Sequence, residues 1–184
     1  MNIFQKTSSY RFRLMTTAYD KWLKENERVL DIGCGRGTIT KLLRHHYSLQ
    51  LQACDIKNYL IYNDIPFKKM ASDKLPKFKR KFDTALLNDV LHHIPKENQE
   101  NLIKDALRVA KKVLIFEMKP SLVAKISDAT LNKFHYGDLS TPLSFRDLSE
   151  WKSLFKKLHV KLEVKVMRKP FWYPFSHIAF LIQK

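Results

Sequence analysis

The chain of 184 residues lacks several features that define other classes of protein. No apolar run approaches the ~20 residues of a membrane-spanning helix, and the polar, basic stretch 1–13 has no apolar core of a secretory signal. The only two cysteines, Cys34 and Cys54, form neither a CxxC pair nor a Cys/His metal spacing. Internal repeats and Pro/Gly/Ser-rich linkers are also missing. We therefore expect a single cytoplasmic domain in a reducing compartment, without a structural metal.

Acidic residues are scarce: 18 Asp and Glu stand against 34 Lys and Arg, which gives a formal net charge of +16. This charge favours association with RNA, DNA, anionic lipid or acidic substrates. A lysine-biased surface is the competing interpretation, because 25 of the basic residues are Lys and only 9 are Arg, whereas base and phosphate recognition favours Arg. We favour the lysine-biased surface, also for the basic stretch 68–81. Nucleic-acid binding stays open as an alternative.

Short apolar segments alternate with amphipathic ones, which is the pattern of a parallel sheet covered by helices on both faces. The fold class is therefore α/β. The first 26 residues predict a helical cover that precedes the sheet. Helical spacing predicts further helices over residues 38–46, 97–110, 122–134 and, after a capped start at 144–147, to about 158. Predicted strands cover residues 28–32, 49–55, 67–71, 82–87, 113–117, 162–167 and 177–182.

The segment Val29-Leu30-Asp31-Ile32-Gly33-Cys34-Gly35-Arg36-Gly37 joins the first predicted strand to a glycine loop. Gly33, Gly35 and Gly37 allow a tight turn and a close approach of the backbone to a ligand, where a Cβ atom would intrude. Ligands of open α/β sheets bind in the crevice outside the carboxyl ends of the strands, where this loop would lie. The loop therefore predicts a site for a nucleotide-like cofactor.

Polar side chains follow three later strands at the same edge. Asp55 ends the second strand, where a carboxylate can accept both hydroxyls of a ribose. Asp73 follows the third strand and can accept a hydrogen bond from an adenine amino group. Asn88 ends the fourth strand and begins the segment Asn88-Asp89-Val90-Leu91-His92-His93, in which four of the six residues are polar. These positions strengthen the prediction of a cofactor that contains adenosine.

Together these motifs resemble class I, seven-stranded S-adenosylmethionine-dependent methyltransferases, in particular the small-molecule branch with a VLHHI-type element, here residues 90–94. The resemblance covers nearly the whole chain. It implies a doubly wound, mostly parallel sheet of seven strands whose last strand is antiparallel, with S-adenosylmethionine as the cofactor. It also implies one domain over residues 1–184, with a helical cover 1–26, a cofactor-binding half 28–118 and a substrate-side half 119–184.

Carried over to this sequence, the resemblance assigns cofactor contacts to the loop and the strand ends. Asp31 and the three loop glycines would line the methionine part of the cofactor. Asp55 would hold the ribose, Asp73 the adenine edge, and Asn88 the wall beside the sulfonium. Neighbouring residues complete the predicted cofactor site: Cys34, Ile56 and Lys74.

Methyl transfer from a sulfonium is an in-line displacement that an enzyme can promote by holding donor and acceptor in place. A base is needed only where the acceptor must lose a proton. His93 is the first candidate, and the alternative is that the pair His92–His93 is a structural part of its turn. His135 is the second, on an irregular segment with Tyr136 and Asp138, where all three side chains could equally cap a loop.

The sequence limits the classes of molecule that can accept the methyl group. Residues 88–91 lack the prolines and the stacking aromatic that amino-methylating nucleic-acid enzymes carry after the fourth strand. Neither cysteine lies near the fourth or fifth strand, where a cysteine nucleophile would be needed. We therefore expect a small or lipid-like acceptor. An RNA-modifying methyltransferase is the alternative, and a non-catalytic domain of the same fold is less favoured.

An aromatic segment joins the last two predicted strands and, in the resembled fold, emerges at the carboxyl edge beside the cofactor. It carries basic residues and four aromatics: Arg168, Lys169, Phe171, Trp172, Tyr173 and Phe175. These aromatics could wall a lipid-like acceptor or make a peripheral contact with a membrane interface. Equally, they could fold back to complete the core or form a dimer contact.

Overall fold

All strands of the described residues form one seven-stranded sheet in the computed structural model, which describes residues 3–121, 143–173 and 175–184. The strand order is β3-β2-β1-β4-β5-β7-β6. The strands β1 to β5 pair in parallel, while β7 runs antiparallel to both of its neighbours, β5 and β6. The bounds are β1 Arg28–Ile32, β2 Gln50–Asp55, β3 Phe67–Lys69, β4 Phe82–Asn88, β5 Ala110–Met118, β6 Lys161–Val166 and β7 His177–Gln183. The predicted mostly parallel sheet with an antiparallel last strand is thus confirmed.

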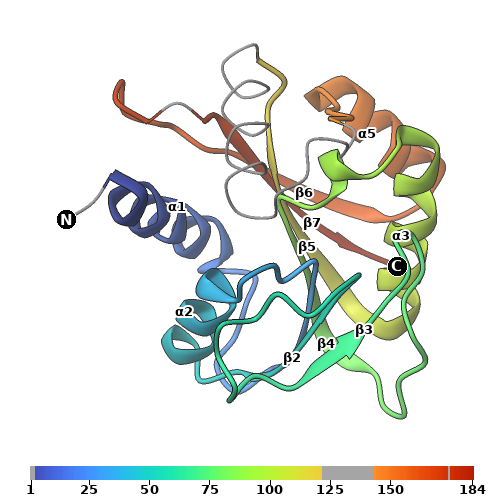
Figure 1. The fold of residues 1–184 in the computed structure, drawn as a ribbon. Helices are drawn as coiled ribbons and strands as arrows, with labels where there is room; N and C mark the ends of the chain where they lie inside the picture. The colour runs from blue at the N-terminus through green and yellow to red at the C-terminus, as the bar shows by residue number, and fades with distance from the viewer. Residues whose placement is uncertain (1–2, 122–142, 174) are drawn as a thin grey trace.

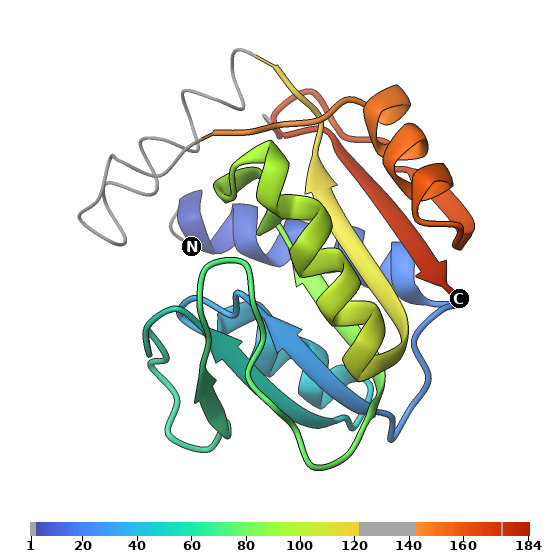
Figure 2. The same ribbon diagram turned by 90° about the vertical axis from the view of Figure 1, so that its right-hand side faces the viewer.

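Helices cover both faces of the sheet (Figure 1). On one face lie α1 (Ile3–Tyr19) and α2 (Thr38–His46), and on the other lie α3 (Lys96–Val109) and α5 (Leu148–Lys157). Figure 2 shows α3 in front of the sheet and α1 behind it. Along each strand, successive apolar residues alternate between the two cores: Leu30 packs with α3 and α5, whereas Val29 packs with α1 and α2.

The helix α5 shows how local sequence sets an element. Asp147 caps it, because its side chain accepts the Glu150 N–H (2.8 Å) while the Glu150 side chain accepts the Asp147 N–H (2.9 Å). Trp151 and Phe155 then follow at helical spacing and pack against Phe180 of β7. The capped start predicted at residues 144–147 is therefore placed at Asp147.

Several boundaries differ from the prediction, most of them by one or two residues. The helix that covers the sheet ends at Tyr19 and leaves residues 20–26 without helix. The helix expected over 97–110 ends at Val109, and β5 begins directly at Ala110, which pairs with Phe82 at the start of β4. The predicted helix 122–134 lies outside the described residues.

The carboxyl ends of the parallel strands share one edge with the start of β7. The pairing of Met118 with His177 brings the end of β5 beside the beginning of β7. The β6–β7 connection therefore emerges at this edge, as predicted. Within the described part of the chain, no helix combines the length and the apolar character that crossing a bilayer requires.

Candidate active site

The glycine loop lies at the carboxyl end of β1 and leads into α2. The Gly33 N–H donates to the carbonyl oxygen of Cys54 (2.8 Å), which ties the loop to β2. Gly33 has a φ of 72°, and a Cβ atom there would lie 2.5 Å from a methyl group of Val90. Glycine is therefore required at this position both for its conformation and for the space it leaves.

Asp55 ends β2 and faces this loop. Its carboxylate accepts the N–H groups of Gly35 (2.8 Å) and Ile56 (2.7 Å). Burial raises the pKa of Asp55, and these two hydrogen bonds oppose the rise. A carboxylate oxygen has lone pairs for more than one donor, and the Ile56 side chain beside it is 48% exposed. The end of β2 can therefore receive two hydroxyl groups next to an apolar contact.

Asp31 lies buried one residue before the end of β1. Thr40 of α2 donates to its carboxylate (2.6 Å). Burial raises the pKa of Asp31 to about 6; the Thr40 hydrogen bond opposes this, and the charge of Asp55 adds to it. Such a carboxylate would be stabilised by a positive group of a ligand, which is typical of a binding site.

Asn88 ends β4 and has an amide that the protein uses only in part. The Tyr19 hydroxyl of α1 donates to Asn88 Oδ1 (2.6 Å), and both residues are buried. Asn88 Nδ2 is also buried and lies beside the Asp31 carboxylate, whose pKa it lowers by hydrogen bonding, but it makes no hydrogen bond of good geometry among the described residues. Buried polar groups are nearly always partnered, so this weakly partnered amide is suited to bind a ligand at this edge.

The remaining predicted cofactor residues lie on the glycine loop and on the segment that follows β3. The Met70 N–H donates to the carbonyl oxygen of Asp55 (2.9 Å), which brings the segment after β3 beside the end of β2. In that segment Asp73 is half-buried and Lys74 is exposed. Cys34 is half-buried in the glycine loop, and burial raises the pKa of its thiol well above the ordinary value. The thiol is therefore neutral at physiological pH.

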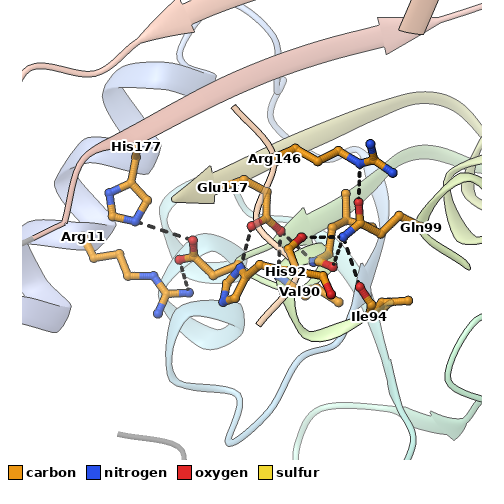
Figure 3. A network of polar contacts seen from close by, with 11 residues as sticks. Arg11, Val90, His92, Ile94, Gln99, Glu117, Arg146 and His177 are labelled. Carbon is orange, nitrogen blue, oxygen red and sulfur yellow. Dashed lines mark hydrogen bonds and ion pairs between the residues drawn. The ribbon is translucent and has the colours of Figure 1, made fainter. Parts of the chain in front are cut away.

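A partly buried charge cluster joins three distant parts of the chain at the same edge (Figure 3). Asp89, which follows β4 with a φ of 54°, binds Arg11 of α1 (2.8 Å) and lies 3.5 Å from His177 Nε2 at the start of β7. Burial alone would raise the pKa of Asp89, but the Arg11 guanidinium and His177 hold it well below its usual range. The cluster thus fixes α1 and β7 against the loop after β4.

Glu117 near the end of β5 orders the turn that follows this loop. Its Oε1 accepts the N–H groups of Val90 (2.9 Å) and Leu91 (2.7 Å), and its Oε2 lies 2.6 Å from His92 Nδ1. Ligand atoms of Asp89, His92 and Glu117 lie within 4.8 Å of one another, as a metal site would need. Arg11 and the two backbone N–H groups already bind these carboxylates, so the arrangement serves structure better than metal binding.

The two histidines of the short 3-10 helix η1 (Leu91–His93) differ in their surroundings. His92 is buried between Glu117 and the ring of Phe145, on which it stacks at 4.9 Å. The structural interpretation therefore fits His92. His93 is only half-buried and stays the predicted base. His135, Tyr136 and Asp138 lie outside the described residues.

The aromatics of the β6–β7 connection divide into two pairs. Tyr173 and Phe175 are buried and belong to the core beneath α1, so the alternative that the segment folds back to complete the core fits these two. Phe171 and Trp172 are exposed. Consecutive residues of an irregular loop have no period, which is why sequence alone did not separate the pairs.

Sequence reasoning also gave no role to Arg11, Tyr19, Glu117 and His177. Glu117 had a usable signal, since an acid that ends a strongly apolar strand must find partners when it is buried. Arg11, Tyr19 and His177 had none, because their partners Asp89 and Asn88 are far away along the chain.

The sheet order, the glycine loop and the acidic strand ends define a class I S-adenosylmethionine-dependent methyltransferase fold. A family model described as a methyltransferase domain matches residues 7–162, and the chain belongs to this family. The cofactor of the family is S-adenosylmethionine. The protein is accordingly an S-adenosylmethionine-dependent methyltransferase. No curated protein matches the chain in sequence.

Solved structures agree on the fold. Magnesium protoporphyrin IX methyltransferase from Synechocystis PCC 6803, crystallised with SAH, has a TM-score of 0.66 and 16% identity over 100% of this chain and 89% of its own. A SAM-dependent methyltransferase from Archaeoglobus fulgidus has a TM-score of 0.72 and 14% identity over 97% and 94%. Phosphoethanolamine N-methyltransferase 2 from Haemonchus contortus, in complex with S-adenosylmethionine, has a TM-score of 0.67 and 15% identity over 96% and 52%.

Proposed function

We propose that the protein transfers a methyl group from S-adenosylmethionine to a small or lipid-like acceptor, mainly by holding donor and acceptor in place. One observation carries the proposal. Two carboxylates with raised pKa values, Asp31 and Asp55, lie at one sheet edge with the glycine loop and the weakly partnered Asn88 amide. The cofactor supplies an activated methyl group on a positive sulfonium, together with a positive amino group. The carboxylates at this sheet edge have few positive groups beside them, so a positively charged ligand would bind well there.

The residues at this sheet edge would each bind a different part of the cofactor. Asp55 would accept the ribose hydroxyls, with Ile56 packed on the adenine and Asp73 at the adenine amino group. Asp31, Gly33, Gly35 and Gly37 would line the methionine part, with Asn88 beside the methyl group. Cys34 and Lys74 would complete the wall. Where the acceptor must lose a proton, His93 would take it.

The charge of this edge supports a small acceptor over a polyanion. Its strand ends carry the carboxylates of Asp31, Asp55, Asp89 and Glu117, and Arg11 is occupied by Asp89. A phosphate backbone would be repelled here rather than attracted. Two of the solved structures with this fold are named for small acceptors, magnesium protoporphyrin IX and phosphoethanolamine.

Calorimetry with S-adenosylmethionine and its demethylated product tests the cofactor half. Asp55→Ala removes the acceptor of two hydroxyls, and hydrogen bonds to a charged group contribute about 1.5–3 kcal/mol each, so affinity should fall by roughly 100-fold or more. Asp64→Ala is the matched control, because Asp64 is an exposed acid paired with Arg44 and Lys41. Unchanged affinity in a folded Asp55→Ala protein would refute the assignment.

Transfer of a labelled methyl group tests the acceptor half. The purified protein and labelled S-adenosylmethionine would be incubated with an organic-solvent extract of cells and, separately, with total RNA. Label in the extract supports the proposal, whereas label in RNA alone overturns it.

RNA modification is the second candidate, and the exposed basic stretch 68–81 favours it. If RNA is the acceptor, affinity for bulk RNA should fall by orders of magnitude over a modest rise in salt. Weak binding that does not depend on salt would remove this candidate.

A further inference from the structure

The β6–β7 connection contains a segment that we call the aromatic tip, residues 168–172. Phe171 is 102% exposed and Trp172 is 54% exposed, so two consecutive large apolar side chains face solvent. Figure 1 shows the connection reaching out from the sheet toward the side of the molecule on which α1 lies. Large exposed aromatics of this kind mark an interaction surface when they lie together.

The base of the aromatic tip is held firmly by the protein. The Lys169 ammonium donates to the carbonyl oxygen of Tyr173 (2.7 Å), and the Met167 N–H donates to that of His177 (3.0 Å). Tyr173 is buried, and Tyr10 of α1 makes edge contacts with Tyr173 (4.8 Å) and with Trp172 (4.9 Å). The exposed residues Phe171 and Trp172 are therefore anchored by contacts with the buried Tyr173 and with α1.

The two segments that build the aromatic tip and its base carry basic residues and no acidic ones. The helix α1 contains no Asp or Glu, and neither does the chain from residue 164 to residue 184. Arg13, Arg168 and Lys169 are exposed in these two segments. The acid next in sequence, Glu163, accepts a hydrogen bond from Trp22 Nε1 (2.9 Å). Aromatic and basic side chains thus share a corner built from two segments without acids.

We propose that the aromatic tip docks the protein on an anionic lipid bilayer, with Phe171 and Trp172 in the interface and Arg168 and Lys169 against the headgroups. Trp is favoured at the boundary between headgroups and acyl chains, and basic residues are attracted to anionic headgroups. A projecting tip suits a bilayer better than RNA, which binds along a groove that tracks its backbone. This inference does not depend on which acceptor is methylated.

Docking would bring the methyl-transfer edge close to the membrane. The connection joins β7 at His177, which lies 3.5 Å from Asp89 in the charge cluster at that edge. An acceptor in the bilayer, or one released from it, would therefore meet the protein at the side where the cofactor binds.

Tryptophan fluorescence gives a direct test with the intact chain. Of the three tryptophans, Trp22 and Trp151 are only 4% and 2% exposed, so a blue shift on binding reports Trp172. Phosphatidylcholine vesicles with about one third phosphatidylserine should produce this shift and sediment the protein, since anionic surfaces attract basic segments. Vesicles of phosphatidylcholine alone should bind much more weakly.

Variants separate the aromatic tip from the general charge of the protein. Phe171→Ser should reduce partitioning at least severalfold, and Phe171→Ser with Trp172→Ser at least about tenfold, because binding scales with buried apolar area. Arg168→Glu should weaken binding by roughly 10-fold or more, since each basic residue near the surface contributes about fivefold. Arg80→Glu makes the same charge change on the exposed basic stretch and should have little effect.

The readout also distinguishes failure of this inference from failure of the proposed function, because cofactor affinity should stay unchanged in all four variants. Absence of binding to anionic vesicles would overturn the docking proposal. So would binding that survives in the folded Phe171→Ser variant and in the double variant, or a Trp172 shift produced by single-stranded RNA and not by vesicles.

Discussion

Replacing Gly33 by Ala tests how tightly the glycine loop is built into the fold. The new side chain would sit at a φ of 72°, which costs about 1–2 kcal/mol for a residue other than glycine. Its Cβ atom would lie 2.5 Å and 2.8 Å from the two methyl carbons of Val90, and such overpacking costs roughly 1–3 kcal/mol. Gly33→Ala should therefore lower the free energy of unfolding by about 2–5 kcal/mol.

A double variant separates the two causes. Val90→Ala removes both methyl groups and should restore the roughly 1–3 kcal/mol of overlap when it is combined with Gly33→Ala, while the cost of the positive φ remains. Gly37→Ala is the matched control: its φ is 77°, but its new Cβ atom would meet a terminal methyl group of the Leu60 side chain. That methyl can move aside, so mainly the conformational cost is expected.

Urea unfolding followed by tryptophan fluorescence measures the free energy of unfolding of the parent protein, the three single variants and the double variant. The reasoning fails if Gly33→Ala loses less than about 1 kcal/mol, the lower limit of the conformational cost alone. It also fails if the losses of Gly33→Ala and Val90→Ala simply add, because two overlapping groups must show coupling.

Two further predictions concern buried carboxyl groups. The pKa of Asp31 is raised from 3.8 to about 6 on folding, so the folded state binds the proton more tightly and stability should decline as pH rises from about 4 to 6. Asp31→Asn should abolish this decline and stabilise the protein by up to about 3 kcal/mol at pH 7, whereas a profile equal to that of the parent protein would contradict the assignment. Glu117→Ala should lose roughly 3–5 kcal/mol in urea unfolding, because two buried N–H groups lose their acceptor, while Glu117→Gln keeps an acceptor oxygen and should lose much less. Equal losses in the two Glu117 variants would show that these hydrogen bonds are not the cause.

The elements that sequence predicts best are those that a local pattern determines. The strand β1 and the helix α2 have the predicted bounds, because a short apolar run, a glycine loop and helical spacing follow one another without ambiguity. The junction of α3 and β5 differs from the prediction, because the chain passes from Val109 to Ala110 with no loop between the elements. A sequence has no turn residue to mark such a boundary.

The sequence predicts those parts of the candidate site in which each residue lies at the end of its own strand. Asp55 and Asn88 could be placed because each ends a parallel strand, and parallel strands end at one edge. The cluster of Arg11, Asp89 and His177 could not, because it depends on how α1 and β7 pack on the loop after β4. The contribution of a buried ion pair to stability depends on its three-dimensional partners, which no local pattern records.

The position of β7 has a consequence for how the protein is made. This strand lies between β5 and β6 in the sheet, although it follows both in the chain. During synthesis, β5 therefore keeps an open edge, and β6 has no strand to pair with, until His177–Gln183 have left the ribosome. Unpaired apolar strand edges promote aggregation, so the nascent chain passes through a vulnerable interval. Slow synthesis of residues 161–183 should prolong this interval. A chaperone that shields β5 should reduce aggregation during it.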